Sequence, residues 1–221
     1  MTAGSEPSPG GIVARPRTPG AAPAQPMLRG LALAHAWPDG TVVFEGLEVV
    51  VMPGLSLVRA GDGRGKTTLL RLMAGELAPA AGSIERTAGP LFWHDPRDAR
   101  DDQRLVDDCL DEQRARFADW DERRRAALFE AFGMQPHRGK RLEQLSTGSR
   151  RKVWLVAALA CGAPLVLLDT PFASLDAPSR RLLVAELARL GAVRQQAVVI
   201  ADFETPPGLE NLIAGVIDLG D

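Results

Sequence analysis

The chain has 221 residues, 45% hydrophobic content and a formal net charge of −2. This length supports one substantial core with a small inserted subdomain, and the near-neutral charge excludes the basic footprint of a nucleic-acid-binding protein. Two cysteines without a C-x-x-C motif and three scattered histidines exclude a Cys/His metal site and favour a reduced, cytoplasmic setting.

The N-terminal segment, residues 1–26, is rich in proline, glycine and alanine. It cannot build a core and is expected to be disordered, so one folded domain is expected over 27–221. The first residues lack the apolar centre of a secretory signal. The longest apolar stretch, 153–168, is interrupted by Gly162 and Pro164 and is too short for a bilayer. Any membrane span would therefore come from a partner chain.

Short apolar runs bounded by Gly, Pro and Asp predict strands, and longer periodic runs predict helices. The predicted strands cover residues 31–34, 41–44, 47–51, 55–58, 83–86, 91–93, 165–168, 197–200 and 214–219, and the predicted helices cover about 69–74, 148–161 and 180–190. Alternating strands and helices favour an α/β fold with a parallel sheet and a phosphate site at its C-terminal edge.

The segment 97–125 differs in character, because it is highly charged and has few apolar residues. Within it, residues 105, 106, 109 and 110 have the spacing of one narrow helical face, and residues 128, 129 and 132 continue that spacing. We expect an inserted helical subdomain over about 97–160, with the charges on its solvated face.

A glycine-rich segment follows the predicted strand 55–58 and opens onto a predicted helix. It reads Ala60, Gly61, Asp62, Gly63, Arg64, Gly65, Lys66, Thr67 and Thr68. Strand, loop and helix form the context of a phosphate-binding loop, in which backbone N–H groups and the helix dipole attract phosphate. Lys66 would reach the β- and γ-phosphates, and Thr67 would ligate Mg²⁺. Ala60 stands where the motif has glycine, and the alternative is a glycine-rich turn with a chance Lys-Thr pair.

Three further features follow the loop. The strand 165–168 ends in Asp169, a position at which P-loop proteins hold Mg²⁺. The segment Leu145, Ser146, Thr147, Gly148 and Ser149 begins a helix, where a hydroxyl and free N–H groups make a second anion site or an ordinary serine N-cap. The third feature is the turn Ser174, Leu175 and Asp176.

The order and spacing of these motifs resemble the ATP-binding cassette (ABC) ATPases over about 28–221, and within that family look most like the haem-exporter ATPase subunit of cytochrome c maturation. The resemblance implies a RecA-like P-loop core sheet, mostly parallel with an antiparallel part, and an inserted helical subdomain. It implies ATP held between the loop and a facing domain's signature, with Ser146 and Gly148 contacting the γ-phosphate across the dimer and Asp176 in the dimer-contact turn (the D-loop). Trp37 would stack on adenine; the alternative is a surface turn.

The residues that the family uses for hydrolysis are absent. Thr170 stands where a glutamate activates water, and a threonine cannot act as a base near neutral pH. Asp202 stands at the position of the switch histidine. Asp95 aligns best with the glutamine that senses Mg²⁺, ahead of Gln103, and its carboxylate would join Thr67 and Asp169 as a Mg²⁺ ligand.

The sequence therefore predicts an ATP-binding subunit that binds Mg-ATP and hydrolyses it slowly or not at all. The expected partners are a membrane-spanning transporter subunit and a second ABC ATPase domain, in a homodimer or heterodimer, on the inner face of the cell membrane. One alternative is a regulatory subunit paired with an intact ABC ATPase. Another is an active ATPase with rearranged residues, and a third is a module that has lost nucleotide. A P-loop kinase or GTPase is disfavoured by the signature at 145–149.

Overall fold

The computed structural model describes residues 25–86 and 89–220, so the first 24 of the residues expected to be disordered lie outside it. The strands are β1 (Leu28–Ala36), β2 (Val42–Val51), β3 (Gly54–Arg59), β4 (Ala81–Arg86), β5 (Leu91–Phe92), β6 (Leu165–Asp169), β7 (Ala197–Asp202) and β8 (Ile213–Asp218). The helices are α1 (Lys66–Ala74), α2 (Val106–Arg116), α3 (Glu122–Ala131), α4 (Thr147–Ala160) and α5 (Ala177–Val193), with 3-10 turns at Gln135–His137 and Leu142–Gln144.

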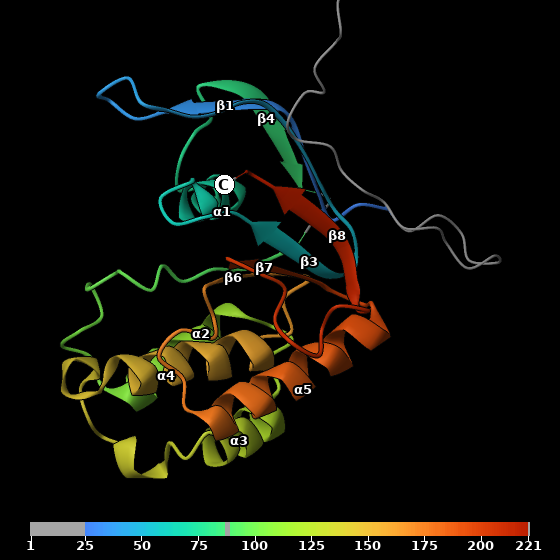
Figure 1. Ribbon diagram of the computed structural model, residues 1–221. Helices are drawn as coiled ribbons and strands as arrows, with labels where there is room; N and C mark the ends of the chain where they lie inside the picture. The colour runs from blue at the N-terminus through green and yellow to red at the C-terminus, as the bar shows by residue number, and fades with distance from the viewer. Residues whose placement is uncertain (1–24, 87–88, 221) are drawn as a thin grey trace, which may run out of the picture.

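The strands form two sheets (Figure 1). A parallel sheet has the order β5-β6-β7-β3-β8, and an antiparallel sheet has the order β2-β1-β4. The expected mostly parallel core sheet with an antiparallel part is confirmed. In the parallel register Asp169 pairs with Ala201 and Arg59 pairs with Asp202. Both carboxylates therefore lie at the strand edge from which the glycine-rich loop leaves β3.

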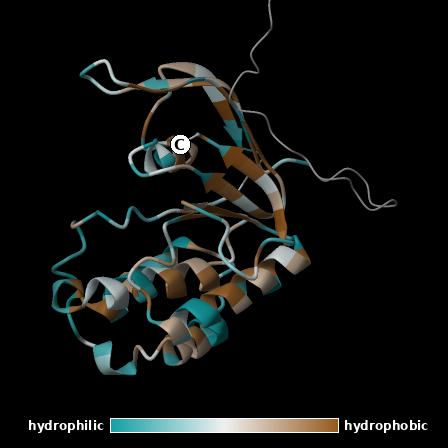
Figure 2. Cartoon of the chain, in the orientation of Figure 1, coloured by the Kyte–Doolittle hydropathy of each residue, from teal (hydrophilic) through white to brown (hydrophobic). Residues whose placement is uncertain are grey.

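The parallel sheet is buried on both faces. Alternate residues of β6, such as Val166 and Leu167, point into two different apolar clusters. One cluster includes α1 and the antiparallel sheet, and the other includes α2, α3, α4 and α5, an arrangement that Figure 1 shows as two layers on opposite sides of the sheet. Figure 2 shows the strands of this sheet as almost continuously hydrophobic, as a doubly covered parallel sheet requires.

The predicted elements agree with the structure apart from shifts of a few residues at their ends, for example at the starts of β1 and α1, and two differences have an identifiable cause. The runs 41–44 and 47–51 join into the single strand β2, because Gly46 takes a φ of 67° and the pairing with β1 shifts register there. Helix α5 begins earlier than predicted, because the Asp176 carboxylate accepts a hydrogen bond from the backbone N–H of Ser179 and caps it. No helix among the described residues is long and apolar enough to cross a membrane. The division at about 97–160 remains a prediction.

Candidate phosphate-binding site

The glycine-rich loop joins the end of β3 to the start of α1. Gly65 precedes the helix with a φ of 91°, a backbone conformation that favours glycine. A Cβ at this position would lie 2.3 Å from Cγ1 of Val43 in β2. Ala60, where the motif has glycine, is buried. The loop is therefore compact and leaves the helix N-terminus open toward a cavity.

Lys66 is buried at the first position of α1, with 7% of its surface exposed. Its ammonium donates hydrogen bonds to the carbonyl oxygens of Ala60 at 2.7 Å and Gly61 at 2.8 Å. The carboxylate of Asp62 lies 3.9 Å from the same nitrogen. These carbonyls fix the cation at the loop, and a further N–H remains to be shared with an anion.

Thr67 links α1 to the end of β6. Its hydroxyl donates to Oδ2 of Asp169 at 2.5 Å and accepts from Nη2 of Arg97 at 2.7 Å. Burial raises the pKa of Asp169, and the Thr67 hydrogen bond and the Arg97 charge oppose that rise. The two expected Mg²⁺ ligands are thus adjacent, with a cationic side chain bonded to one of them.

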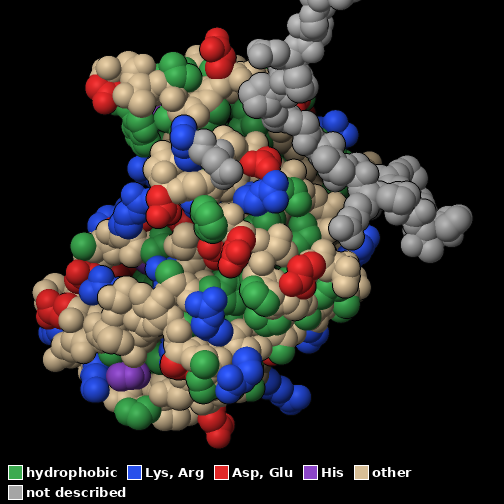
Figure 3. Space-filling view, viewed as in Figure 1, with side chains coloured by type: hydrophobic (Ala, Val, Ile, Leu, Met, Phe, Trp, Pro, Cys, Tyr) green, Lys and Arg blue, Asp and Glu red, His purple; other side chains and the backbone are tan. Residues whose placement is uncertain are grey.

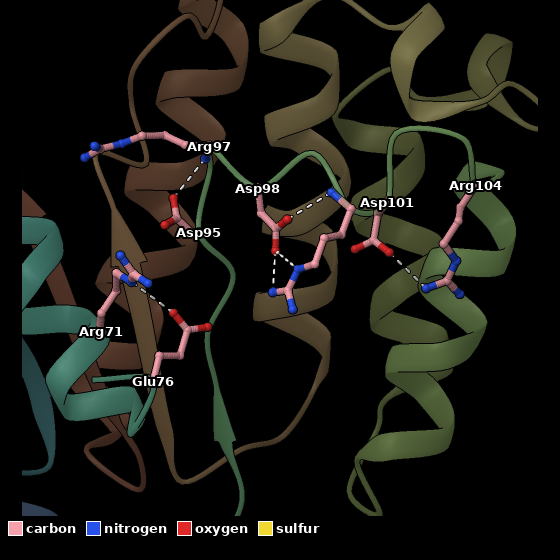
Figure 4. Close-up of polar contacts among 8 residues, drawn as sticks. Arg71, Glu76, Asp95, Arg97, Asp98, Asp101 and Arg104 are labelled. Atoms are coloured by element: carbon pink, nitrogen blue, oxygen red, sulfur yellow. Dashed lines mark hydrogen bonds and ion pairs between the residues drawn. The ribbon is translucent and has the colours of Figure 1, made fainter. Parts of the chain in front are cut away.

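The third expected ligand, Asp95, takes part in a turn. Its Oδ1 accepts a hydrogen bond from the backbone N–H of Arg97 at 2.9 Å, and its carbonyl accepts from the backbone N–H of Asp98 at 2.9 Å. Figure 4 shows the Arg97 guanidinium pointing away from this carboxylate. Asp95 lines the same cavity as Thr67, but its carboxylate accepts a hydrogen bond within the turn that carries Arg97.

The oxygen donors suit Mg²⁺ in kind, but their arrangement does not fit the ion. A magnesium ion bonded to the Thr67 hydroxyl at about 2.1 Å would lie within about 5 Å of Nη2 of the exposed Arg97 side chain in this arrangement, and the two cations would repel each other. Magnesium at Thr67, Asp169 and Asp95 therefore remains a prediction that this geometry does not support.

Thr170 follows Asp169 in a strained backbone conformation, with a φ of 43° that β-branched residues rarely adopt. Its N–H donates to the Ala201 carbonyl at 2.8 Å. The Arg151 guanidinium donates to the Thr170 carbonyl and, at 3.1 Å, to that of Asp169. Burial lowers the pKa of Arg151, and the Asp169 charge opposes that effect. Arg151 thus holds in place a segment that offers a hydroxyl rather than a base.

Asp202 ends β7 at the same edge of the sheet, and its Oδ1 accepts from the backbone N–H of Phe203 at 2.8 Å. Burial raises its pKa. The Phe203 hydrogen bond and the Lys66 charge oppose that rise, and the negative charge of Asp169 adds to it. Asp202 therefore lies within the electrostatic field of the loop, where a carboxylate weakens the attraction for phosphate.

The segment 145–149 begins α4, with the Ser146 hydroxyl accepting from the Ser149 N–H at 3.1 Å. Ser146 and Thr147 are exposed. A Cβ on Gly148 would lie 2.3 Å from the carbonyl oxygen of Ser174, so glycine is required where this helix meets the turn 174–176. The N-cap reading is thus confirmed, and contact with a γ-phosphate across a dimer remains a prediction.

A cavity of about 480 Å³ lies over the loop. The predicted site residues in its lining are Trp37, Asp62, Gly63, Gly65, Lys66, Thr67, Thr68, Asp95, Asp169 and Thr170. Arg71, Pro96, Arg97 and Arg151 also line it, whereas the predicted residues Ala60, Gly61 and Arg64 do not. Trp37 is 39% exposed and packs edge-on against His35. Its position at the cavity wall suits a planar ligand, although its role as the adenine platform remains a prediction. Asp202 and the segments 145–149 and 174–176 are not part of this lining.

The sequence motifs did not identify two arginines of the site. Arg97 appeared there only as the start of the charged segment, and Arg151 was not assigned a role. Their side chains reach the site from an irregular segment and from the second turn of α4. The faint signal for Arg97 was its position two residues after Asp95, itself a predicted site residue.

Comparisons with known proteins agree in finding ABC transporter ATP-binding proteins. A family model described as ABC transporter matches residues 58–173. The cytochrome c biogenesis ATP-binding export protein CcmA of Novosphingobium aromaticivorans is 37% identical over 174 residues, covering 77% of this chain and 85% of that protein. The protein of the same name from Sphingopyxis alaskensis is 33% identical over 178 residues, covering 80% and 91%. In fold, the chain resembles a putative ABC transporter ATP-binding protein from Pyrococcus furiosus, with a TM-score of 0.69, 20% identity and coverage of 87% and 96%.

Proposed function

This chain belongs to the ABC transporter family as an ATP-binding subunit, and we propose that it binds ATP at the glycine-rich loop and hydrolyses it slowly or not at all. The observation that carries the proposal is the contrast within one site. Lys66 and the α1 N-terminus are arranged to hold phosphate, whereas the positions beside the expected γ-phosphate carry Thr170 and Asp202. Neither residue supplies the usual glutamate base or histidine contact.

ATP binding would use features that need no other chain. The N–H groups at the start of α1 and the Lys66 ammonium converge on the cavity, and the helix dipole adds to their attraction for phosphate. Trp37 at the cavity wall would stack on the base. These residues bind and orient the nucleotide without moving a proton.

Slow ATP turnover is expected from the residues at two strand ends, Thr170 after β6 and Asp202 in β7. Thr170 cannot accept a proton from water near neutral pH, and loss of a general base typically lowers a rate by about 10²–10⁴-fold. Asp202 brings negative charge where the attacking water and γ-phosphate already concentrate it. Bound ATP would then stabilise one conformation of the chain or its complex with a partner, rather than drive a cycle of hydrolysis at this site.

The partners we propose are a membrane-spanning transporter subunit and a second ABC ATPase domain. Ser146 and Thr147 are exposed at the start of α4 and are therefore accessible to a facing domain. In a heterodimer with an intact ATPase, this chain would donate Ser146 and Gly148 to the partner's competent site. Such an assembly would place the chain on the inner face of the membrane through its partner.

A second candidate function is an active ATPase that uses Asp202 as its base. The observation in its favour is the raised pKa of this partly buried carboxylate beside the loop, since a higher pKa makes a better base. Replacement by asparagine, Asp202→Asn, separates the two. Turnover that falls sharply in this variant would favour the active enzyme, and unchanged turnover would exclude Asp202 as the base.

Binding at the loop is tested by titrating ATP into the full chain and into two lysine variants. Lys66→Ala removes a buried cation from the site and is expected to weaken binding by about tenfold or more. Lys140→Ala removes an exposed lysine outside the cavity lining and is the matched control, expected to bind as the wild type does. Equal affinity in all three proteins would contradict ATP binding at this loop.

A further inference from the structure

We propose that the guanidinium of Arg97 supplies the positive charge that a divalent cation would supply, so that this chain binds ATP without Mg²⁺. This role rests on ATP binding at the loop, the function proposed above. Its starting point is the contact between Arg97 and Thr67, which places a permanent cation on the oxygen that was expected to hold the metal. The ligand is then the free nucleoside triphosphate rather than its magnesium complex.

Three groups make a short relay at this point. Nη2 of Arg97 donates to the Thr67 hydroxyl at 2.7 Å, and that hydroxyl donates to Oδ2 of the buried Asp169 at 2.5 Å. The guanidinium charge therefore offsets part of the Asp169 charge through the hydroxyl. Thr67 directly follows Lys66 at the helix N-terminus, so the guanidinium lies where phosphate oxygens are expected.

The segment that carries Arg97 is ordered by its own hydrogen bonds. Asp95 accepts from the backbone N–H of Arg97 at 2.9 Å, and the Asp98 carboxylate accepts from Nε of Arg100 at 2.6 Å. Within residues 89–220, neither carboxylate forms an ion pair with the Arg97 guanidinium, which points away from Asp95 in Figure 4. Within the described residues, the Arg97 side chain hydrogen bonds only to the Thr67 hydroxyl. Several N–H donors remain for a ligand.

The chemistry of the guanidinium matches a polyphosphate. Arginine stays charged at all relevant pH values and presents a planar fork that bonds two phosphate oxygens at once. Arg97 and Lys66 are both cationic residues in the lining of one cavity of about 480 Å³. Positive charge for the β- and γ-phosphates is thereby built into the chain.

The experiment is a calorimetric titration of ATP into the full chain in excess EDTA and again in excess Mg²⁺. The wild type is expected to change its Kd by less than about threefold between the two buffers. Arg97→Gln is expected to lose about tenfold or more in EDTA and to recover affinity when Mg²⁺ is added. Arg97→Lys keeps the charge and is expected to fall between them. Arg123→Gln, which replaces an exposed arginine of α3 outside the cavity lining, is the control and should match the wild type.

The outcomes separate this role from the function on which it rests. Wild-type binding that appears only with Mg²⁺ would overturn the role of Arg97 and leave ATP binding intact. The same would follow if Arg97→Gln bound as the wild type in both buffers, once its melting temperature had shown that it folds. Absence of saturable binding in either buffer would overturn ATP binding and the role of Arg97 together.

Discussion

At the scale of single residues, the site is defined by which charges lie beside the loop. Lys66 and Arg97 bring positive charge to the cavity, while the buried Asp169 and the partly buried Asp202 are carboxylates whose pKa values are raised by burial. The two cations attract a polyphosphate, whereas a charged carboxylate repels it. These residues therefore lead us to expect that the site binds ATP and hydrolyses it slowly or not at all.

His94 provides a pH test of the packing beside the site. It stacks on Trp154 with ring centroids 3.8 Å apart, and burial lowers its pKa to about 4, against the opposing charges of Asp98, Asp101 and Asp95. The unfolded chain would bind a proton near pH 6.5, whereas the folded chain would not until about pH 4. The free energy of unfolding is therefore at its full value above the pKa of His94 in the unfolded chain. It decreases as the pH falls toward the pKa of His94 in the folded chain.

We expect the free energy of unfolding of the wild type to fall by about 2 kcal/mol more than that of His94→Gln between about pH 7 and pH 5. Urea denaturation of both proteins at the two pH values measures this difference, and comparison of the two cancels the titration of other groups. An equal fall in both proteins would show that His94 is not held neutral by its surroundings.

At the scale of elements, the site depends on the junction between α4 and the end of β6. The Arg151 guanidinium, from α4, donates to the carbonyls of Asp169 and Thr170 and holds the strained turn after β6. Neighbouring Arg150 points elsewhere and pairs with Asp102 at 2.9 Å. The two arginines thus differ in what they hold, although they are adjacent in sequence.

Arg151→Ala is expected to lower the free energy of unfolding by about 2 kcal/mol, because hydrogen bonds from a charged group to partly buried carbonyls are lost. Arg150→Ala, the matched control, is expected to lose less than about 1 kcal/mol, as partly exposed ion pairs usually do. Equilibrium urea denaturation measures both values. Equal losses would mean that Arg151 does not clamp the end of β6.

The elements themselves could be predicted because their patterns are local. The apolar runs of β6 and β7 and the glycine-rich loop carry their structural meaning in consecutive residues. The resemblance to ABC ATPases was likewise confirmed by the match over 58–173. Arg97 and Arg151 could not be predicted, since a long side chain from an irregular segment or a helix can reach many places. The left-handed backbone of Thr170 was also unforeseen, because threonine disfavours it.

At the scale of the whole molecule, the two sheets and the helices bring the residues of the proposed phosphate site together and leave Ser146 and Thr147 at the start of α4 exposed. Figure 3 shows acidic and basic side chains interspersed over the face in view, without a broad field of one sign. Specific docking to a membrane-spanning subunit and a second ATPase domain then has to come from local surfaces, such as the exposed start of α4. In such an assembly this chain would act by holding ATP.

The most direct test of this account is steady-state ATP turnover by the purified full chain at saturating ATP, with Mg²⁺, beside Lys66→Ala. Enzymes commonly turn over at about 1 s⁻¹ or faster, and loss of the general base predicts a rate lower by about 10²-fold or more. We therefore predict that ATP binds measurably and that the wild-type protein turns it over at about 10⁻² s⁻¹ or more slowly. Turnover of about 1 s⁻¹ or more that Lys66→Ala abolishes would contradict the account.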